Sequence, residues 1–167
     1  MRKPAAAVGS TVFFAAAPAV VAGALPFALT GWEVDAEWWP PLRVLGALLL
    51  VAAAGTLVQA FARFVLEGLG TPAPVAPTEH LVVGGLYRHV RNVMYIAVTA
   101  AIVGQALILG SVVLLVYAAL IWAVMAAFVR FYEEPTLARR YGAQYEAYRR
   151  AVPAWLPRLS GARWPSS

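Results

Sequence analysis

The chain contains no cysteine and has little charge for its length. Charged residues make up 13% of its 167 residues, whereas a soluble domain normally carries about 25%. Without cysteine, disulfide bonds, thiolate metal sites and cysteine nucleophiles are all excluded. The two histidines, His80 and His89, are nine residues apart with no convincing set of carboxylates, so we expect no metal site.

Long stretches of the sequence contain no charged residue. They run from Pro4 to Trp32, from Val44 to Ala62 and from Val93 to Val129. About 20 apolar residues form a helix that crosses a bilayer, so each stretch can supply at least one crossing. The third has 37 residues and as one helix would be about 55 Å long, against roughly 30 Å of hydrocarbon. We therefore expect a hairpin that turns at Gly110-Ser111.

The sequence thus predicts an all-α polytopic membrane protein that forms a single membrane domain over residues 1–167. About four transmembrane helices are expected, at 8–30, 42–66, 93–109 and 112–132. The first two belong to residues 1–67, and residues 159–167 form a tail. Pro18 and Pro26 fall inside the first helix, where neighbouring helices would satisfy the carbonyl groups that a proline leaves without a donor.

Basic residues are unevenly distributed around these predicted helices. With the N-terminus in the cytoplasm, twelve of the thirteen lysines and arginines lie on the cytoplasmic side, whereas the first connection carries Glu33, Asp35 and Glu37. The positive-inside rule therefore predicts both termini in the cytoplasm, at a bacterial cytoplasmic membrane. The N-terminal apolar run exceeds the core of about 7–15 residues in a signal peptide, so we expect a retained anchor. The net charge of +5 suits anionic lipid headgroups, and nothing suggests a nucleic-acid partner.

The second predicted helix contains two features of interest. Ala52 to Gly55 offers a face of small residues for close helix packing. Gln59, Arg63 and Glu67 share one face near the cytoplasmic end. That face is either an exposed stripe with an Arg63–Glu67 pair or a contribution to a functional site. The proline-rich stretch 71–77 that follows is either a linker or a loop that covers a site.

The C-terminal part predicts one further helix. Pro135 is expected to end or break the fourth membrane helix. Apolar and aromatic residues then recur at helical spacing: Leu137, Tyr141, Tyr145 and Tyr148. Most of the nearby arginines fall on the other side, which predicts an amphipathic helix on the cytoplasmic interface that Pro153 and Pro157 close.

Two polar clusters flank the long uncharged stretch. The first contains Tyr87, Arg88, Arg91, Asn92 and Tyr95, and the second contains Glu133 and Glu134. Each has an ordinary explanation by itself: arginines flank membrane helices, tyrosines anchor at interfaces, and glutamates at a helix end are neutralised by a nearby arginine. The hairpin, however, would bring both clusters to the same membrane face. There the start of a helix also offers free N–H groups to an anion.

These segments, taken in order, resemble the isoprenylcysteine carboxyl methyltransferase family and the wider group that includes the phospholipid N-methyltransferases. The matching segments are Gly85-Leu86-Tyr87, Arg91 to Tyr95, Glu133 to Leu137, Tyr141 to Tyr148, Val152-Pro153 and Leu156-Pro157, within roughly residues 70–158. One position departs from the family pattern, because Val93 stands where the family has proline. Proline suits a first helical position, so valine there costs some rigidity.

The resemblance implies a methyltransferase that uses S-adenosylmethionine, with residues 68–158 as its cofactor-binding region. It places cofactor contacts at Glu79, His80, Leu81, Val82, Tyr87, Asn92, Val93, Met94, Tyr95 and Glu133. The candidate catalytic residues are Arg91, Glu133 and Glu134. Methyl transfer from a sulfonium to a carboxylate or thiolate needs alignment and exclusion of water, so positioning would supply most of the catalysis, and no general base is assigned.

The methyl acceptor is open: a lipophilic or small carboxylate, amine or thiol. We expect an apolar acceptor to reach the site laterally from the lipid. Two other functions compete with this reading. One is a non-catalytic membrane protein of the same fold that binds a lipid or partner, which Val93 favours. The other is a membrane reductase with a nicotinamide cofactor, whose phosphates would need a denser basic pocket than Arg88 and Arg91 provide.

Overall fold

A computed structural model describes residues 16–35, 39–67 and 81–159. All regular structure in these three ranges is helical, as predicted, with no strand among them. The elements are η1 (Val20–Ala24), α2 (Leu25–Thr30), α3 (Pro40–Glu67), η2 (Gly85–Arg88), α4 (Val93–Leu109), α5 (Val112–Phe128), η3 (Val129–Glu133), α6 (Glu134–Tyr141) and α7 (Ala143–Ala151). The elements η1 and η3 are π-helical turns, and η2 is a 3₁₀ turn.

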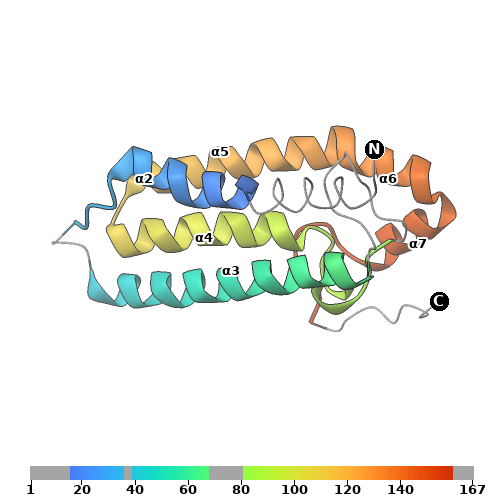
Figure 1. Ribbon diagram of the computed structural model, residues 1–167, viewed down its shortest axis with the longest axis horizontal. Coiled ribbons are helices and arrows are strands. Elements are labelled where there is room, and N and C mark those ends of the chain that lie inside the picture. Colours follow the sequence, from blue (N-terminus) through green and yellow to red (C-terminus); the bar gives the residue numbers. More distant parts are fainter. Residues whose placement is uncertain (1–15, 36–38, 68–80, 160–167) are drawn as a thin grey trace.

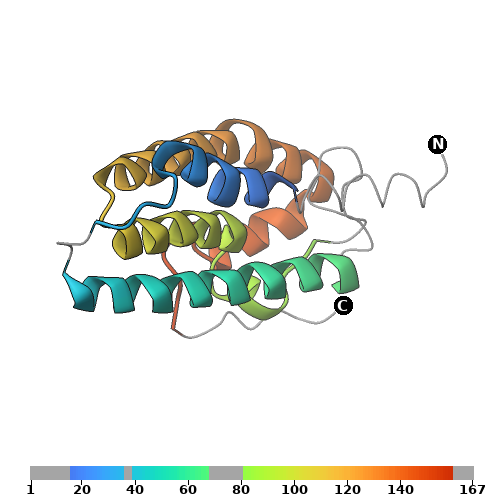
Figure 2. The ribbon, with the colours of Figure 1, turned by 60° about the vertical axis from the view of Figure 1, so that its left-hand side comes forward.

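The helices form an elongated antiparallel bundle in which α4 lies between α3 and α5 (Figure 1). The η1–α2 segment packs against α4 and α5. One end of the bundle holds the end of α2, the start of α3 and the α4–α5 turn (Figures 1 and 2). The other end holds η2, the start of α4, α6 and α7, so segments far apart in the sequence meet there.

The predicted hairpin turns where the sequence indicated. Helix α4 ends at Leu109 and α5 begins at Val112. Gly110 adopts the left-handed conformation (φ 73°, ψ 25°) that favours glycine at a helix C-terminus. The Ser111 hydroxyl accepts a hydrogen bond of 3.4 Å from the Leu114 N–H and caps α5. Ile102 and Leu114, from opposite arms, are fully buried in the core between them.

Two described helices are long and apolar enough to cross a membrane, Pro40–Arg63 and Val112–Tyr141. Only 17% of the most apolar window of each is buried inside the protein, which leaves large apolar side chains facing outward. The other two apolar helices, Ala16–Thr30 and Val93–Leu109, are shorter. The structure therefore supports two of the four predicted crossings by length. The beginning of the first predicted crossing, 8–15, lies outside the described residues.

Neighbouring helices compensate for the proline in the first apolar helix, as predicted. Pro26 has no N–H to offer the carbonyl groups one turn earlier, and the chain widens there into η1. The Gln105 side-chain amide of α4 donates to the Ala22 carbonyl at 2.6 Å. The Tyr117 hydroxyl of α5 donates to the Val21 carbonyl at 2.8 Å. Two polar side chains thus fix η1 to the α4–α5 hairpin inside an apolar region.

Helices α3 and α4 come into backbone contact at Gly46 and Gly104. A Cβ atom added at Gly46 would lie 2.6 Å from the Gly104 carbonyl oxygen. The predicted small-residue face of the second helix is only partly right. Ala53 is buried, but Gly55 is exposed, and a Cβ added there meets nothing within 4 Å. The close approach lies about two turns earlier than the small-residue run indicated.

We expect Gly46→Ala to destabilise the protein by about 1–3 kcal/mol, because the added methyl group forces two backbones apart. Gly55→Ala is the matched control in the same helix. It should be neutral or stabilising, because alanine favours a helix over glycine by about 1 kcal/mol. Unfolding of the two variants in mixed micelles by increasing denaturing detergent measures the difference. Equal stability of the two would mean that α3 and α4 do not touch at Gly46.

Two predictions about the C-terminal region are wrong. Pro135 does not end the fourth helix, because η3 continues directly into α6 and places the proline in the first turn of α6, where its missing N–H is tolerated. The single amphipathic helix is two short helices, because Gly142 (φ 51°, ψ −126°) breaks it. The aromatic side of α7 does not lie open toward an interface. Tyr145 and Tyr148 are buried against Leu81 and Val83.

Candidate functional site

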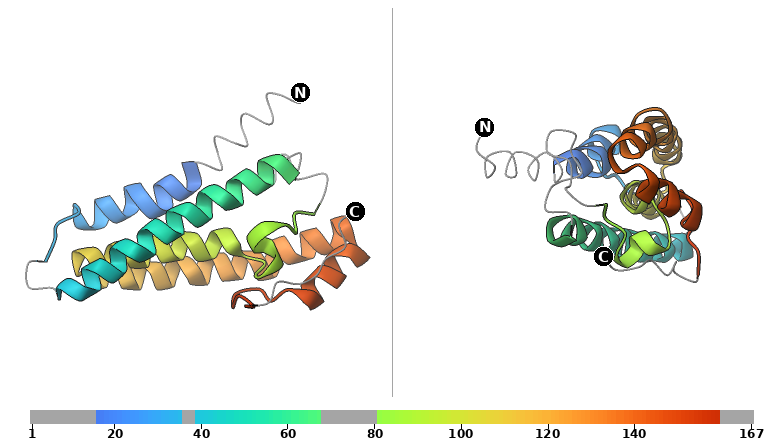
Figure 3. Two further views of the ribbon diagram at one scale, coloured as in Figure 1. Left: turned by 90° about the horizontal axis from the view of Figure 1, so that it is seen from below. Right: turned by 90° about the vertical axis from the view of Figure 1, so that its right-hand side faces the viewer.

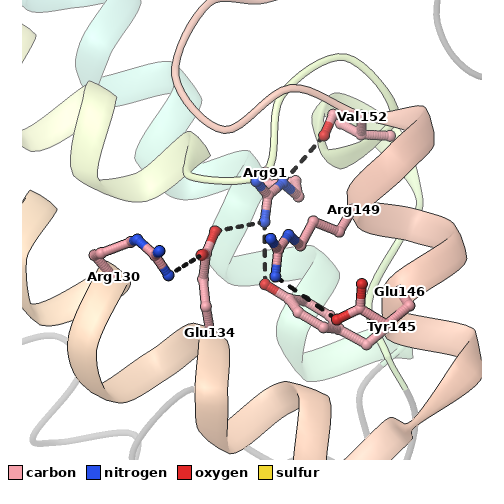
Figure 4. Close-up of polar contacts among 7 residues, drawn as sticks. All are labelled: Arg91, Arg130, Glu134, Tyr145, Glu146, Arg149 and Val152. Atoms are coloured by element: carbon pink, nitrogen blue, oxygen red, sulfur yellow. Dashed lines mark hydrogen bonds and ion pairs between the residues drawn. The ribbon is translucent and has the colours of Figure 1, made fainter.

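The polar residues that flank the hairpin converge where α4 begins (Figure 4). The Arg91 guanidinium lies between the start of α6 and α7. Its Nη1 donates to Glu134 Oε1 at 2.8 Å and to the Tyr145 hydroxyl at 3.0 Å, and its Nε donates to the Val152 carbonyl at 3.0 Å. The Arg91 and Glu134 side chains are each only 11% exposed. Arg91 therefore joins three parts of the chain at a largely desolvated point.

The C-terminal segment 152–158 pairs with the residues that precede α4. The Arg91 and Asn92 N–H groups donate to the carbonyls of Pro153 and Ala154 at 2.9 and 3.2 Å. The Arg158 N–H donates to the His89 carbonyl at 3.0 Å, and the His89 ring Nδ1 donates to the Arg158 carbonyl at 2.8 Å. This pairing fixes the entrance of α4 and uses the predicted closing proline, Pro153, through its carbonyl.

The two adjacent carboxylates bind different partners near the start of α4. The Tyr95 hydroxyl donates to Glu133 Oε2 at 2.9 Å, whereas Glu134 binds Arg91. Arg91 lies two residues before α4 and Tyr95 lies in its first turn, and both side chains reach the carboxylates where η3 meets α6. The carboxylates sit where η3 meets α6, and π-turns of this kind are frequent at functional sites.

The two carboxylates of the site are not equally neutralised. Among the described residues, Glu133 forms no ion pair, and its hydrogen-bond partner Tyr95 is neutral. Arg130 lies 4.0 Å from Glu134 but its side chain is 70% exposed. The Arg91 guanidinium thus pairs with Glu134, whereas Glu133 contacts the neutral Tyr95 hydroxyl. The site therefore favours a positively charged group near Glu133.

Three tyrosines pack beside these charges. Tyr87, Tyr145 and Tyr148 are 5%, 2% and 4% exposed, and the Tyr148 hydroxyl donates to the Tyr87 carbonyl at 2.8 Å. Burial raises the pKa of all three phenols, and the charge of Glu133 adds to the rise at Tyr87. They are therefore neutral at physiological pH, where the Tyr148 hydroxyl donates a hydrogen bond and the Tyr145 hydroxyl accepts one from Arg91.

These raised tyrosine pKa values predict loss of stability at alkaline pH. Above a pH of about 10 the unfolded chain loses the phenol protons, whereas the folded chain keeps them. Stability should then fall as pH rises, by up to about 1.4 kcal/mol per pH unit for each buried tyrosine. Unfolding measured at several pH values above about 9 tests this. The fall should be shallower for Tyr148→Phe, and an unchanged slope would show that Tyr148 ionises equally in both states.

Asn92 brings a buried hydrogen-bond donor to the start of α4. It is 7% exposed, and its side-chain nitrogen Nδ2 has no acceptor among the described residues. It occupies the N-cap position of α4 without making a capping hydrogen bond. A buried donor of this kind beside the first N–H groups of a 17-residue helix can bind an anionic group.

The structure separates the predicted site residues into groups. Arg91, Tyr95, Glu133 and Glu134 meet through the hydrogen bonds described above, with Tyr87 and Asn92 buried at the same end. Val82 and Val93 belong instead to an apolar cluster with Ala60, Tyr87 and Val90, with Met94 packed against it, and Leu81 packs on the α7 tyrosines. Glu79 and His80 lie outside the described residues.

Some functional candidates were not evident from the sequence. Tyr145 was expected on an interfacial helix face, but its hydroxyl contacts Arg91. Arg91 also binds the backbone carbonyl of Val152, and no residue type in the sequence could have indicated that contact. Arg63 lies against Gly85, since its Nε is 3.0 Å from the place of a Cβ there, which brings the second helix to this end of the bundle. The predicted Arg63–Glu67 pair involves a side chain outside the described residues. Arg88 is exposed.

Comparison with known proteins gives one family. The sequence model of the family described as phospholipid methyltransferase matches residues 42–144. This range covers more than half of the chain, from the first turn of α3 to the start of α7, and contains both arms of the hairpin. No curated protein sequence matches the chain. Within the described residues, no group of three or more His, Asp or Glu side chains is placed to hold a metal ion.

Proposed function

The chain belongs to the phospholipid methyltransferase family, whose members are membrane methyltransferases related to the isoprenylcysteine carboxyl methyltransferases, and we propose that it transfers a methyl group from S-adenosylmethionine to a lipophilic acceptor. The observation that carries this proposal is the convergence of the Arg91–Glu134 and Tyr95–Glu133 pairs at the start of α4. It gives one small polar site beside an apolar surface.

The residues at this point fit the charges of the proposed cofactor, which has a carboxylate, an ammonium group and a sulfonium. Asn92 Nδ2 and the first N–H groups of α4 would bind the carboxylate. Glu133 would accept hydrogen bonds from the ammonium group or the ribose hydroxyls. The rings of Tyr87 and Tyr95 would lie near the sulfonium. Arg91 would act indirectly, since its three hydrogen bonds fix Glu134, Tyr145 and the C-terminal segment.

When bound, the cofactor would supply a methyl group activated by the sulfonium, whose sulfur would keep the electron pair of the carbon–sulfur bond as the methyl group passed to the lone pair of the acceptor. The chain would align the reactants through Asn92, Glu133 and the aromatic rings, an effect worth up to about 7–11 kcal/mol in favourable cases. The buried side chains of Tyr87 and Val93 would keep water away from this point.

We further propose four membrane crossings, with the site at the cytoplasmic face. The described arginines support this orientation. At the site end lie Arg63, Arg88, Arg91, Arg130, Arg139, Arg140, Arg149, Arg150 and Arg158, whereas the opposite end has Arg43 with Glu33 and Asp35. The acceptor would arrive laterally from the inner leaflet, because the apolar side chains Phe128 and Phe131 are exposed close to the carboxylates. A site that opens only to water would contradict lateral access.

Transfer of label tests the proposed reaction. Purified protein is incubated with methyl-labelled S-adenosylmethionine and extracted membrane lipids, and the labelled product is identified. Label in a lipid fraction supports the proposal and names the acceptor class. Binding of the cofactor without any labelled product would favour the alternative, a non-catalytic member of the family that binds a lipid or partner.

Val93 is the residue that favours the alternative, and its replacement by proline tests whether this position accepts the residue that the family has there. Val93 is the first residue of α4, where no intrahelical N–H is needed. We expect Val93→Pro to be tolerated and to stabilise the protein by about 0.4–1 kcal/mol, without loss of cofactor affinity in calorimetric titration. Ile96→Pro, one turn later, is the contrasting control, because Ile96 donates its N–H to the Asn92 carbonyl at 3.1 Å. A similar loss of stability in both variants would show that position 93 does not have the geometry of a first helical turn.

A further inference from the structure

Four residues on one outer face of the continuous α5–η3–α6 helix are joined one to the next by a ring contact or a hydrogen bond. The rings of Phe128 and Tyr132 stack, with centroids 5.1 Å apart. The Thr136 hydroxyl donates to the Tyr132 carbonyl at 2.7 Å, and Arg139 Nη2 donates to the Thr136 hydroxyl at 3.3 Å. Their spacings of four, four and three residues place them along one side of the helix. Phe128 and Tyr132 are 44% and 49% exposed, and Arg139 is also exposed.

This lipid stripe (Phe128, Tyr132, Thr136 and Arg139) follows the polarity profile of a leaflet. Measured from Val112 along a helix near the bilayer normal, Phe128 lies at about 24 Å, Tyr132 at about 30 Å and Arg139 at about 40 Å. The hydrocarbon is about 30 Å thick, and the headgroups extend the total to about 40–45 Å. Phenylalanine therefore lies among acyl chains, tyrosine at their boundary and arginine at the level of the phosphates.

The exposed charge around the lower part of the stripe is positive. Arg139 and Arg140 are exposed on α6, and Arg130 is 70% exposed one turn before it. The acidic residue of α6, Glu134, is only 11% exposed and is bonded to Arg91. A phosphate beside Arg139 would therefore meet cations without an exposed carboxylate of α6.

We propose that the lipid stripe binds an anionic phospholipid of the surrounding bilayer. One acyl chain lies along Phe128 and Tyr132, and the phosphate is held by the Arg139 guanidinium, which the Thr136 hydroxyl positions by accepting from its Nη2. Arg130 and Arg140 add attraction for a headgroup of net negative charge. This lipid is a bound partner on the outside of the helix, distinct from any acceptor in the site, and the inference does not depend on methyl transfer.

Helix α7 provides a matched control. Its arginines Arg149 and Arg150 are also exposed, but α7 turns back after Gly142 while α6 continues the direction of α5 (Figure 3). We compare the double variants Arg139→Gln/Arg140→Gln and Arg149→Gln/Arg150→Gln, which remove equal charge. The full chain in zwitterionic phosphatidylcholine nanodiscs is titrated with phosphatidylglycerol, and bound lipid is counted by native mass spectrometry while thermal stability is followed.

Phosphatidylglycerol should bind the unmodified chain and raise its unfolding temperature, and inorganic phosphate alone should not. The α6 double variant should bind phosphatidylglycerol about tenfold or more weakly, since each arginine near the surface contributes about a factor of five. The α7 double variant should bind phosphatidylglycerol and gain thermal stability from it as the unmodified chain does. Equal weakening of both would show a general charge effect and overturn the proposal, as would an undiminished response of the α6 variant. Both variants alter exposed side chains, and their unfolding temperatures in phosphatidylcholine alone verify that they fold.

Discussion

Replacement of Arg91 by alanine is expected to lower the free energy of unfolding by about 3–5 kcal/mol, because it leaves Glu134 without its partner at a site with little solvent. Glu134 is 11% exposed, and its other cation, Arg130, is 4.0 Å away and mostly in solvent. The same change removes donors from the Tyr145 hydroxyl and the Val152 carbonyl. Arg91→Lys should be more stable than Arg91→Ala but less stable than the unmodified protein. One ammonium cannot reproduce the geometry of a guanidinium that serves three acceptors.

A double variant separates the neutralisation of Glu134 by Arg91 from the other contacts that Arg91 makes. In Arg91→Ala/Glu134→Gln the unpaired carboxylate is gone, so at least half of the lost stability should return. Unfolding of all three variants in mixed micelles gives the comparison. If the double variant is no more stable than Arg91→Ala alone, the main effect of Arg91 lies in its contacts with Tyr145 and Val152 and not in neutralising Glu134.

Replacement of Glu133 by glutamine is expected to weaken S-adenosylmethionine binding by about 10-fold to 100-fold. The carboxylate would bind the positively charged side of the cofactor, and a hydrogen bond to a charged group is worth about 1.5–3 kcal/mol. The hydrogen bond from Tyr95 survives in this variant, because the glutamine side chain keeps an acceptor oxygen. The fold should therefore stay intact while calorimetry records the loss of affinity.

Glu146→Gln is the matched control for this measurement. Glu146 lies on α7, is half exposed and pairs only loosely with Arg149 at 3.7 Å, so its replacement should leave cofactor affinity unchanged. Tyr95→Phe should cause a smaller loss, about fivefold, since it removes one neutral donor. Unchanged affinity in both Glu133→Gln and Tyr95→Ala, with normal unfolding temperatures, would exclude this site as the place where the cofactor binds.

Local signals predicted the parts of the fold that depend on hydrophobicity and chain reversal. The 37 uncharged residues between the polar clusters could fit a bilayer only as a hairpin, and Gly110-Ser111 was the one strong turn signal inside them. Once the hairpin is known, Arg91 and Tyr95 must lie at the same end as Glu133 and Glu134. The likeness in motif order to a family of membrane methyltransferases is confirmed by the match over residues 42–144.

The remaining features depend on three-dimensional context. Nothing local distinguishes Glu133 from Glu134, and only the geometry of η3 assigns one to Tyr95 and the other to Arg91. Pro135 is a helix breaker by its own chemistry, yet a preceding π-turn accommodates it. Gly142 divides a helix whose spacing is otherwise continuous, and beyond it α7 packs on Leu81 and Val83, which are distant in the sequence. The closest contact of α3 and α4 likewise depends on the register between two helices.

The π-turn η3 has a consequence for the direction of the two carboxylates. Such a turn holds one residue more than an α-turn, and each residue corresponds to about 100° of rotation. The extra residue therefore changes the direction of everything from Glu133 onward relative to the apolar helix from Val112 to Phe128. Substitutions on the exposed side of that helix can change its apolar surface and leave the direction of Glu133 and Glu134 unaltered.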